Sequence, residues 1–192
     1  MKKVLAMTAA LLAVSSASAV ERPYASVAYL MTPLEFDRTN PDAFGLTREN
    51  EFTLDAVQFR GGTMMTRYFG LEAHLMSGVG TAEEKVRDSL NTELGAEVLE
   101  IRYAYGIYGV ARVGSDRMGL YAYAGYNWVR FGMVDTLTSP ATVTEDEDGP
   151  SYGVGIEVPF FWSSSLELDY KSMLDENNYT LTGASIGIRR HF

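Results

Sequence analysis

The sequence predicts an all-β fold in which eight antiparallel strands close into an up-and-down transmembrane β-barrel. Eight segments alternate apolar and polar side chains with the period of two that a β-strand requires. Their connections alternate long and short, as in membrane barrels, whose periplasmic turns are short and whose external loops are longer. Beyond Ala19 no apolar run is long enough for a transmembrane helix, so a membrane-spanning chain must form a closed barrel.

The first 19 residues have the pattern of a cleavable secretory signal peptide. Lys2 and Lys3 precede a short apolar run, and the small residues Ala17 and Ala19 fit a cleavage site after Ala19. We therefore expect residues 1–19 to be removed and residues 20–192 to form one barrel domain.

Composition excludes several classes of function. Without Lys2 and Lys3, 14 basic residues stand against 25 acidic ones, so the net charge is near −11 and nucleic acid is not an expected partner. The chain has no cysteine, which excludes a disulfide framework and thiol chemistry.

The first half of the barrel is predicted as follows. Residues 24–32 form a strand that Pro33 ends, and a long polar loop runs to Glu51. Residues 54–62 form the second strand, which a short connection at 63–67 joins to the third, at 68–77. A second long loop covers residues 78–95.

The second half repeats this organisation. The strands at 98–113 and 118–130 are joined by the tight turn Gly114-Ser115-Asp116-Arg117, and a third long loop covers 132–149. The strand at 151–160 turns at 161–164 into the clearest strand, 165–173, where Leu166, Leu168 and Tyr170 alternate with acidic and basic residues. The final strand covers residues 179–192.

Aliphatic faces are expected to point toward lipid and polar faces into the barrel, where glycines at 62, 106, 153, 155, 183 and 187 leave room. An eight-stranded barrel is only wide enough for its own side chains, so the inward charges should form a hydrogen-bonded network and not line a pore. A narrow ion path through them stays open as an alternative. The predicted interior network consists of Arg60, Glu72, His74, Glu100, Arg102, Glu157, Glu167, Asp169, Lys171 and Arg189.

Aromatic residues are expected at both membrane interfaces. The inner set is Phe69, Phe160, Phe161, Trp162 and Phe192. The outer set is Tyr126, Trp128, Phe131, Tyr152 and Tyr179.

Nothing in the sequence predicts catalysis, a metal site or a cofactor. His74 and Ser77 are three residues apart, which places them on opposite faces of a strand, and no hydroxyl lies beside His191 on its own strand face. The acidic run Glu145–Asp148 lacks the spacing of a calcium loop and is expected to be a solvated loop tip.

The last strand reads Y-T-L-T-G-A-S-I-G-I-R-R-H-F and ends in Phe192. In this it resembles the outer-membrane β-barrel family, in which a terminal Phe serves as an assembly signal, and in size and strand count it resembles the OmpA-type transmembrane domain and small barrels such as OmpX and Ail. The resemblance implies a Gram-negative outer-membrane protein with periplasmic termini and a structural or surface-interaction role. Implied partners are outer-membrane lipid, lipopolysaccharide, the barrel assembly machinery and a surface ligand at the long loops. The sequence stops at Phe192 without a linker, so a peptidoglycan-anchoring role is not expected.

Three functions remain open from the sequence. The first is a filled barrel that acts through its extracellular loops, and the second is a small ion-conducting channel. The third is a soluble periplasmic lipocalin-like carrier of apolar ligands, which would have the opposite orientation, with aliphatic faces lining a cavity.

Overall fold

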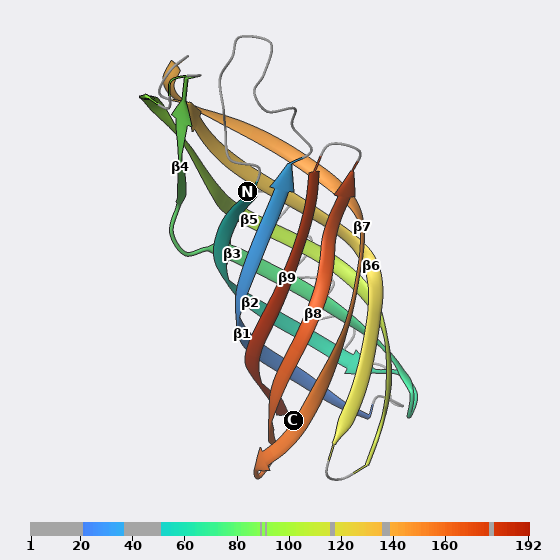
Figure 1. The fold of residues 1–192 in the computed structure, drawn as a ribbon. Coiled ribbons are helices and arrows are strands. Elements are labelled where there is room, and N and C mark those ends of the chain that lie inside the picture. The colour runs from blue at the N-terminus through green and yellow to red at the C-terminus, as the bar shows by residue number, and fades with distance from the viewer. Residues whose placement is uncertain are drawn as a thin grey trace.

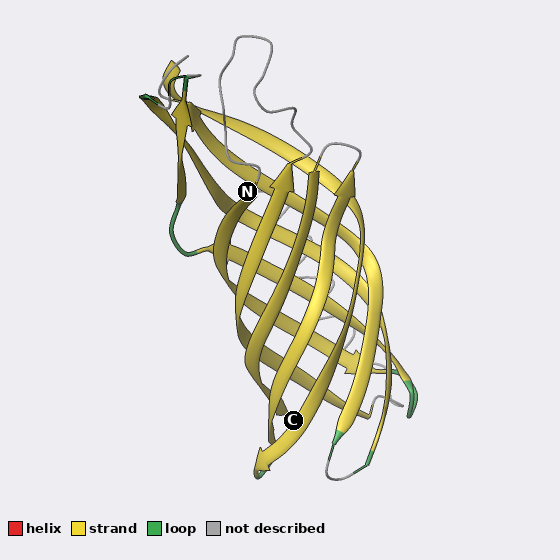
Figure 2. Ribbon diagram, in the orientation of Figure 1, coloured by secondary structure: helices red, strands yellow, loops and turns green. Residues whose placement is uncertain are grey.

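The computed structural model describes residues 21–36, 51–88, 90, 92–115, 118–135, 139–176 and 179–192. The predicted signal peptide and most of the first predicted loop lie outside these residues. Every regular element in the described residues is a β-strand (Figure 2). No helix among them has the length and apolar character that crossing a bilayer would need.

Eight strands form a closed antiparallel ring, because β9 pairs with β1 and β3 pairs with β5 (Figure 1). The ring order is β1-β2-β3-β5-β6-β7-β8-β9, and β4 pairs only with the extension of β5. The predicted eight-stranded barrel is therefore confirmed. The strands are β1 (Glu21–Phe36), β2 (Glu51–Met64), β3 (Phe69–Gly78), β4 (Ala82–Arg87), β5 (Glu93–Gly114), β6 (Gly119–Asp135), β7 (Ser139–Phe161), β8 (Ser164–Glu176) and β9 (Tyr179–His191).

The two ends of the barrel differ. The end where the chain finishes, which we call the lower end, carries the short turns after β2, β5 and β7 (Figure 1). At the opposite, upper end the β4–β5 and β6–β7 hairpins extend past the rest of the ring (Figure 1). As predicted, the short connections lie at one end of the barrel and the long ones at the other. Much of what was predicted as long loop is instead an extension of the strands.

Three predictions about the connections were wrong. Pro33 does not end β1, because it lies in an interruption of the β1–β9 ladder between the Met31–Ala184 and Leu34–Leu181 pairs, where its missing N–H is tolerated. The predicted loop at 78–95 contains β4. The predicted loop at 132–149 belongs largely to β6 and β7, so the acidic run is part of a strand, with Asp146 opposite Arg130.

The orientation of the faces is as predicted in the lower part of the barrel. Leu166, Leu168, Ile186 and Ile188 are 37–49% exposed on the outer wall, whereas Glu167 and Arg189 are fully buried inside. A soluble carrier with an aliphatic cavity requires the reverse. This fold therefore does not fit the lipocalin-like alternative.

Candidate functional site in the barrel interior

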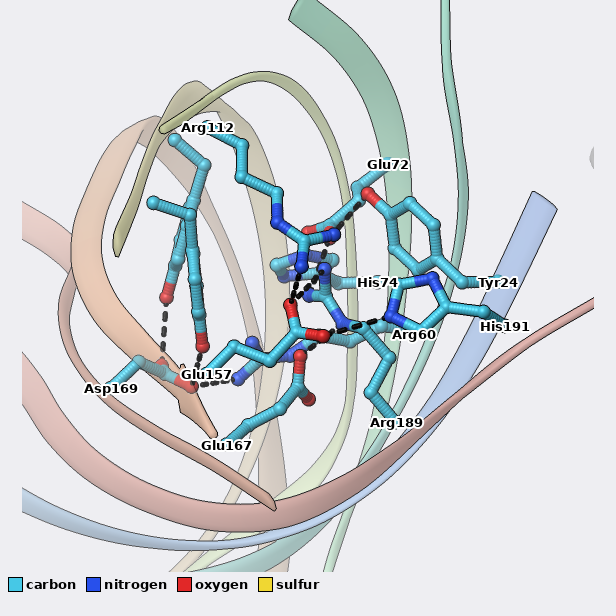
Figure 3. Close-up of polar contacts among 12 residues, drawn as sticks. Tyr24, Arg60, Glu72, His74, Arg112, Glu157, Glu167, Asp169, Arg189 and His191 are labelled. Carbon is cyan, nitrogen blue, oxygen red and sulfur yellow. Dashed lines mark hydrogen bonds and ion pairs between the residues drawn. The ribbon is translucent and has the colours of Figure 1, made fainter. Parts of the chain in front are cut away.

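Arg189 on β9 is the centre of the polar cluster in the lower interior (Figure 3). Its guanidinium donates to Glu72 on β3 at 2.9 Å, pairs with Glu167 on β8, and lies 3.7 Å from Glu157 on β7. The ring of Tyr24 covers the guanidinium at 4.2 Å, and its hydroxyl donates to Glu72 at 2.7 Å. One buried cation on β9 thus contacts side chains from four other strands across the lumen.

Glu157 connects this cluster to the lower mouth of the barrel. Its carboxylate pairs with Arg112 at 3.0 Å and with the Nε2 of His191 at 2.8 Å (Figure 3). Arg112 and His191 are part-exposed, whereas Glu157 is buried. The polar cluster therefore reaches solvent at the lower end through these two side chains.

A second group of contacts converges on Asp169. Arg60, which crosses from β2, donates to its Oδ2 at 2.5 Å, and Ser185 donates to the same oxygen at 2.7 Å. The hydroxyls of Tyr123 and Tyr121 donate at 2.9 Å and 3.3 Å. Such a network of buried, hydrogen-bonded charges holds its side chains in one arrangement.

His74 lies between the two groups and is fully engaged. Its Nε2 contacts Glu72 at 2.8 Å and its Nδ1 contacts the side-chain nitrogen of Gln58 at 3.1 Å. The ring of Tyr108 stacks on the imidazole at 4.1 Å. Ser77 is on the opposite, exposed face of β3, as the spacing predicts, so His74 is not placed to activate it.

Glycines make room for the tyrosine rings in this layer. Gly153 is directly opposite Tyr123 in the β6–β7 ladder, and Gly155 is opposite Tyr121. A Cβ at either glycine would lie 2.5 Å from the facing ring. The rings therefore lie flat against the wall, which leaves the centre of the lumen to the charged side chains.

Most of the upper interior is apolar, which corrects the prediction of a polar interior throughout, although the buried Thr32 and Glu97 also lie there. Its apolar side chains are at most 6% exposed and pack into one hydrophobic core. That core consists of Leu30, Leu34, Leu54, Ala56, Met76, Leu99, Ile101, Ala104, Val129, Phe131, Met173, Leu174 and Leu181. We call this group the apolar plug.

Glu100 and Arg102 do not belong to the interior network, and their predicted placement was wrong. A register shift in the β5–β6 ladder between Ile101 and Tyr103 inserts one extra residue and reverses the faces above it. Leu99 and Ile101 consequently point inward, whereas Glu100 and Arg102 pair with each other at 3.1 Å on the outside.

The outer wall of β5 and β6 changes character at the same height. Trp128 stacks on Tyr105 at 5.2 Å and contacts Tyr126 at 5.0 Å. Directly above, Arg130 covers the ring of Tyr103 at 5.1 Å and forms an ion pair with Asp146. This order, from aliphatic through aromatic to charged, is typical of a membrane–water interface.

The predicted aromatic belts are partly present. Phe69, Phe160, Phe161, Trp162 and Phe192 are all exposed at the lower end. Tyr126 and Tyr152 are exposed on the outer wall, but Phe131 was misplaced because it points into the apolar plug. The side chain of Tyr179 lies outside the described residues.

The structure brings together Arg60, Glu72, His74, Glu157, Glu167, Asp169 and Arg189, and places Lys171 two residues beyond Asp169 on the same inner face. The predicted network did not include Arg112, His191 or Gln58, nor the tyrosines at 24, 108, 121 and 123, whose side chains also point inward. The parity of β6 indicates Tyr121 and Tyr123, because they alternate with the outward Leu120, Ala122 and Ala124. Among the described residues no group of acidic, His or Cys side chains is arranged to hold a metal ion.

Comparison with known proteins identifies the family. Residues 4–192 match the model of the outer membrane protein beta-barrel domain, although none of the curated proteins matches the chain. Similar solved structures include Ail of Yersinia pestis (12% identity over 90% of this chain and 99% of that one, TM-score 0.53) and Neisserial surface protein A (11%, 88% and 97%, TM-score 0.59). OprG of Pseudomonas aeruginosa is similar over 90% of this chain and 97% of its own (12% identity, TM-score 0.56). These identities support the fold alone. The family match and the closed ring together show that the chain belongs to the outer membrane protein β-barrel domain family and is a small membrane β-barrel of the Gram-negative outer membrane.

Proposed function

We propose that this protein is a closed outer-membrane barrel that acts through surface contacts at its upper hairpins and does not conduct solutes or catalyse a reaction. In this proposal both ends of the chain are periplasmic, and the β4–β5 and β6–β7 hairpins are outside the cell. The observation that carries it is the apolar plug, whose buried side chains pack together inside the barrel between the polar cluster and the upper end. Such an apolar core opposes the passage of water and ions.

The hairpins are the part of the barrel that can contact a partner. β5 and β7 are 22 and 23 residues long, more than the 9–11 residues that a tilted strand needs to cross a bilayer. Their extensions present charged side chains, such as Arg102 and Asp146, on the outside. A rigid wall that ends in exposed hairpins is suited to recognition at the cell surface.

The kind of surface ligand should differ from that of a structural neighbour. One structure of Ail is a complex with the heparin analogue sucrose octasulfate. Here Glu145, Asp146 and Asp148 are exposed on the β6–β7 hairpin, and like charges disfavour a polysulfated ligand. We therefore do not extend that type of ligand to this chain.

Single-cysteine labelling tests the placement, because the native chain has no cysteine. Glu145→Cys lies on the β6–β7 hairpin and Ser163→Cys lies in the turn between β7 and β8, and both positions are exposed. A membrane-impermeant maleimide should label Glu145→Cys on intact cells, and Ser163→Cys only after the outer membrane is permeabilised. If Ser163→Cys alone were labelled on intact cells, the proposed orientation of the barrel in the membrane would be the wrong way round.

Recordings in planar bilayers test the alternative of a small channel. The purified wild-type protein should give no resolved openings. Openings that disappear on Arg189→Met, within the lumen, but persist on Arg102→Met, on the outer wall, would establish conduction through the charge network and overturn the closed barrel.

A further inference from the structure

The two ends of the barrel differ in charge as well as in shape. At the upper end, exposed acids lie on β4 and on the β6–β7 hairpin, such as Glu83 and Glu145. The acidic side chains described in the lower part are buried inside the barrel. The exposed charged side chains that the structure describes at the lower end are Arg67, in the turn after β2, and Arg190, near the end of β9. This rim therefore attracts negatively charged groups.

Arg190 projects from the lipid-facing wall at the height where the aliphatic part of that wall ends. It lies on the same outer face of β9 as Ile186 and Ile188, which are about half exposed. Because a strand rises about 3.3 Å per residue, the Cα of Arg190 is roughly 7 Å beyond that of Ile188 along β9. The guanidinium consequently reaches the polar headgroup layer that borders the hydrocarbon of a bilayer.

The neighbours of Arg190 leave its guanidinium open. Its ladder partners are Ala25 on β1 and Ser164 on β8, which both have small side chains. Neither Arg190 nor Arg67 forms an ion pair within the part of the chain that the structure describes. A guanidinium can donate two parallel N–H groups to a phosphate, so a phosphate is a suitable partner for either arginine.

An exposed aromatic pair lies next to Arg190. Trp162 is 90% exposed and stacks on Phe161 with the ring centroids 4.9 Å apart. The backbone N–H of His191 donates to the carbonyl of Ser163 at 2.8 Å, which holds this turn against the end of β9. Trp162 has a φ of 47°, in the left-handed region that disfavours a bulky side chain. A strained, exposed indole is suited to contact with another molecule, and indoles prefer the membrane–water interface.

We propose that the lower rim binds the headgroups of anionic phospholipids. Arg190 beside the Phe161–Trp162 pair is the main site, and Arg67, which lies over the ring of Tyr68 at 5.5 Å, is a second one. The arginines pair with the phosphates, and the aromatic rings pack against the glycerol and the first acyl carbons. These lipids belong to the periplasmic leaflet, which rests on the proposed orientation of the barrel.

Quenching of tryptophan fluorescence by brominated lipid tests the main site. Trp128→Phe leaves Trp162 as the remaining tryptophan, since the chain has two. This variant is reconstituted into vesicles of phosphatidylcholine and phosphatidylglycerol in which either lipid carries bromine on its acyl chains. Phosphatidylglycerol should be preferred beside Trp162 by roughly fivefold, as expected for one arginine near a membrane surface. Equal quenching by the two brominated lipids, or no quenching by either, would overturn the proposal.

Two further variants in the Trp128→Phe background identify the arginine. Arg190→Gln should remove the preference, whereas Arg102→Gln, on the outer wall at the upper end, should retain it. In vesicles of phosphatidylcholine alone, Arg190→Gln should leave the urea unfolding midpoint unchanged, because the side chain has no ion-pair partner among the described residues. A preference for phosphatidylglycerol that persists in Arg190→Gln would contradict the assignment of the site.

A measurement on the wild-type protein does not depend on the folding of a variant. Native mass spectrometry of protein released from vesicles with equal amounts of the two lipids should show phosphatidylglycerol bound in excess. Bound lipids in the proportion of the vesicles would also overturn the proposal. Both lipid measurements are made in vesicles, so their outcome is separate from that of the cysteine labelling, which tests the orientation in cells.

Discussion

Arg189 stabilises the lower interior by compensating several acids at once. Its guanidinium faces Glu72, Glu157 and Glu167, which come from three different strands. A guanidinium suits this role because it stays charged and offers five donors in a fixed plane. The cost of removing it is set mainly by the buried carboxylates that would be left behind.

Arg189→Met is therefore expected to lower the free energy of unfolding by about 3–5 kcal/mol. Urea unfolding in lipid vesicles, followed by tryptophan fluorescence, measures this change. Arg190→Met is the matched control, since its side chain is exposed on the other face of β9 and its removal should change stability by no more than about 0.5 kcal/mol. Similar losses for the two variants would show that the interior ion pairs contribute little.

Gly155 makes the close approach of Tyr121 possible, so Gly155→Ala should destabilise the barrel by about 1–3 kcal/mol. The added Cβ would lie 2.5 Å from the ring of Tyr121. A Cβ added at Gly109 would lie 3.9 Å from its nearest neighbour, the backbone oxygen of Ala124, so Gly109→Ala is the control without a clash. The double variant Gly155→Ala with Tyr121→Leu should recover part of the loss in the same urea assay, and strictly additive effects would contradict a direct contact.

At the scale of the element, the bulge in β5 reverses which face of the strand points inward. The alternation of apolar and polar residues in the sequence nevertheless continues unbroken across it. Leu99, Ile101, Tyr103 and Tyr105 are all apolar or aromatic at odd positions, as on a regular strand. Below the bulge these positions face outward toward the aromatic belt, and above it they face the apolar plug. One inserted residue reverses the faces at the height where the preferred location of apolar side chains also reverses.

This explains how far the sequence could predict the structure. The lower strands were assigned correctly because lipid outside and charge inside give each face a distinct composition, as in Leu168 and Asp169. Glu100 and Arg102 were misassigned because a bulge leaves the polarity pattern of β5 unchanged. Contacts between distant strands, such as that of Arg60 with Asp169, depend on the closed ring and on side-chain reach, which periodicity does not contain.

The bulge predicts that Ile101 faces the interior and Glu100 faces outward, which is the opposite of what a regularly alternating strand would give. Ile101→Asn should lower stability by about 2–4 kcal/mol, because it places an amide in the apolar plug, whereas Glu100→Asn should change it by no more than about 0.5 kcal/mol. Both changes introduce the same side chain at adjacent positions, so urea unfolding compares the two faces directly. A larger loss of stability for Glu100→Asn than for Ile101→Asn would contradict the bulge and would mean that β5 alternates regularly, with Glu100 inside.

At the scale of the whole molecule, the barrel combines two opposite arrangements of polarity. In the lower part, charged residues such as Arg189 are inside and aliphatic residues such as Ile188 are outside. In the upper part, Leu181 and Ile101 are inside, and polar residues such as Arg102 are outside. The lower part is therefore suited to lipid and the upper part to water, with Tyr105, Tyr126 and Trp128 at the boundary.

This division predicts how strongly an outward charge should destabilise the barrel at each height. Leu168→Arg places a cation on the aliphatic outer wall of β8, and Thr182→Arg places one on the outer face of β9 opposite Ser172, near the upper part. A lipid-facing arginine costs about 2–4 kcal/mol at the middle of a bilayer and about 0–1 kcal/mol near its surface. Urea unfolding in vesicles should therefore show a clear loss for Leu168→Arg and little change for Thr182→Arg, and in lipid with shorter acyl chains the loss at Leu168 should decrease. Equal losses at both positions would mean that the membrane extends well above the aromatic boundary, and the upper hairpins would then not be free to contact partners.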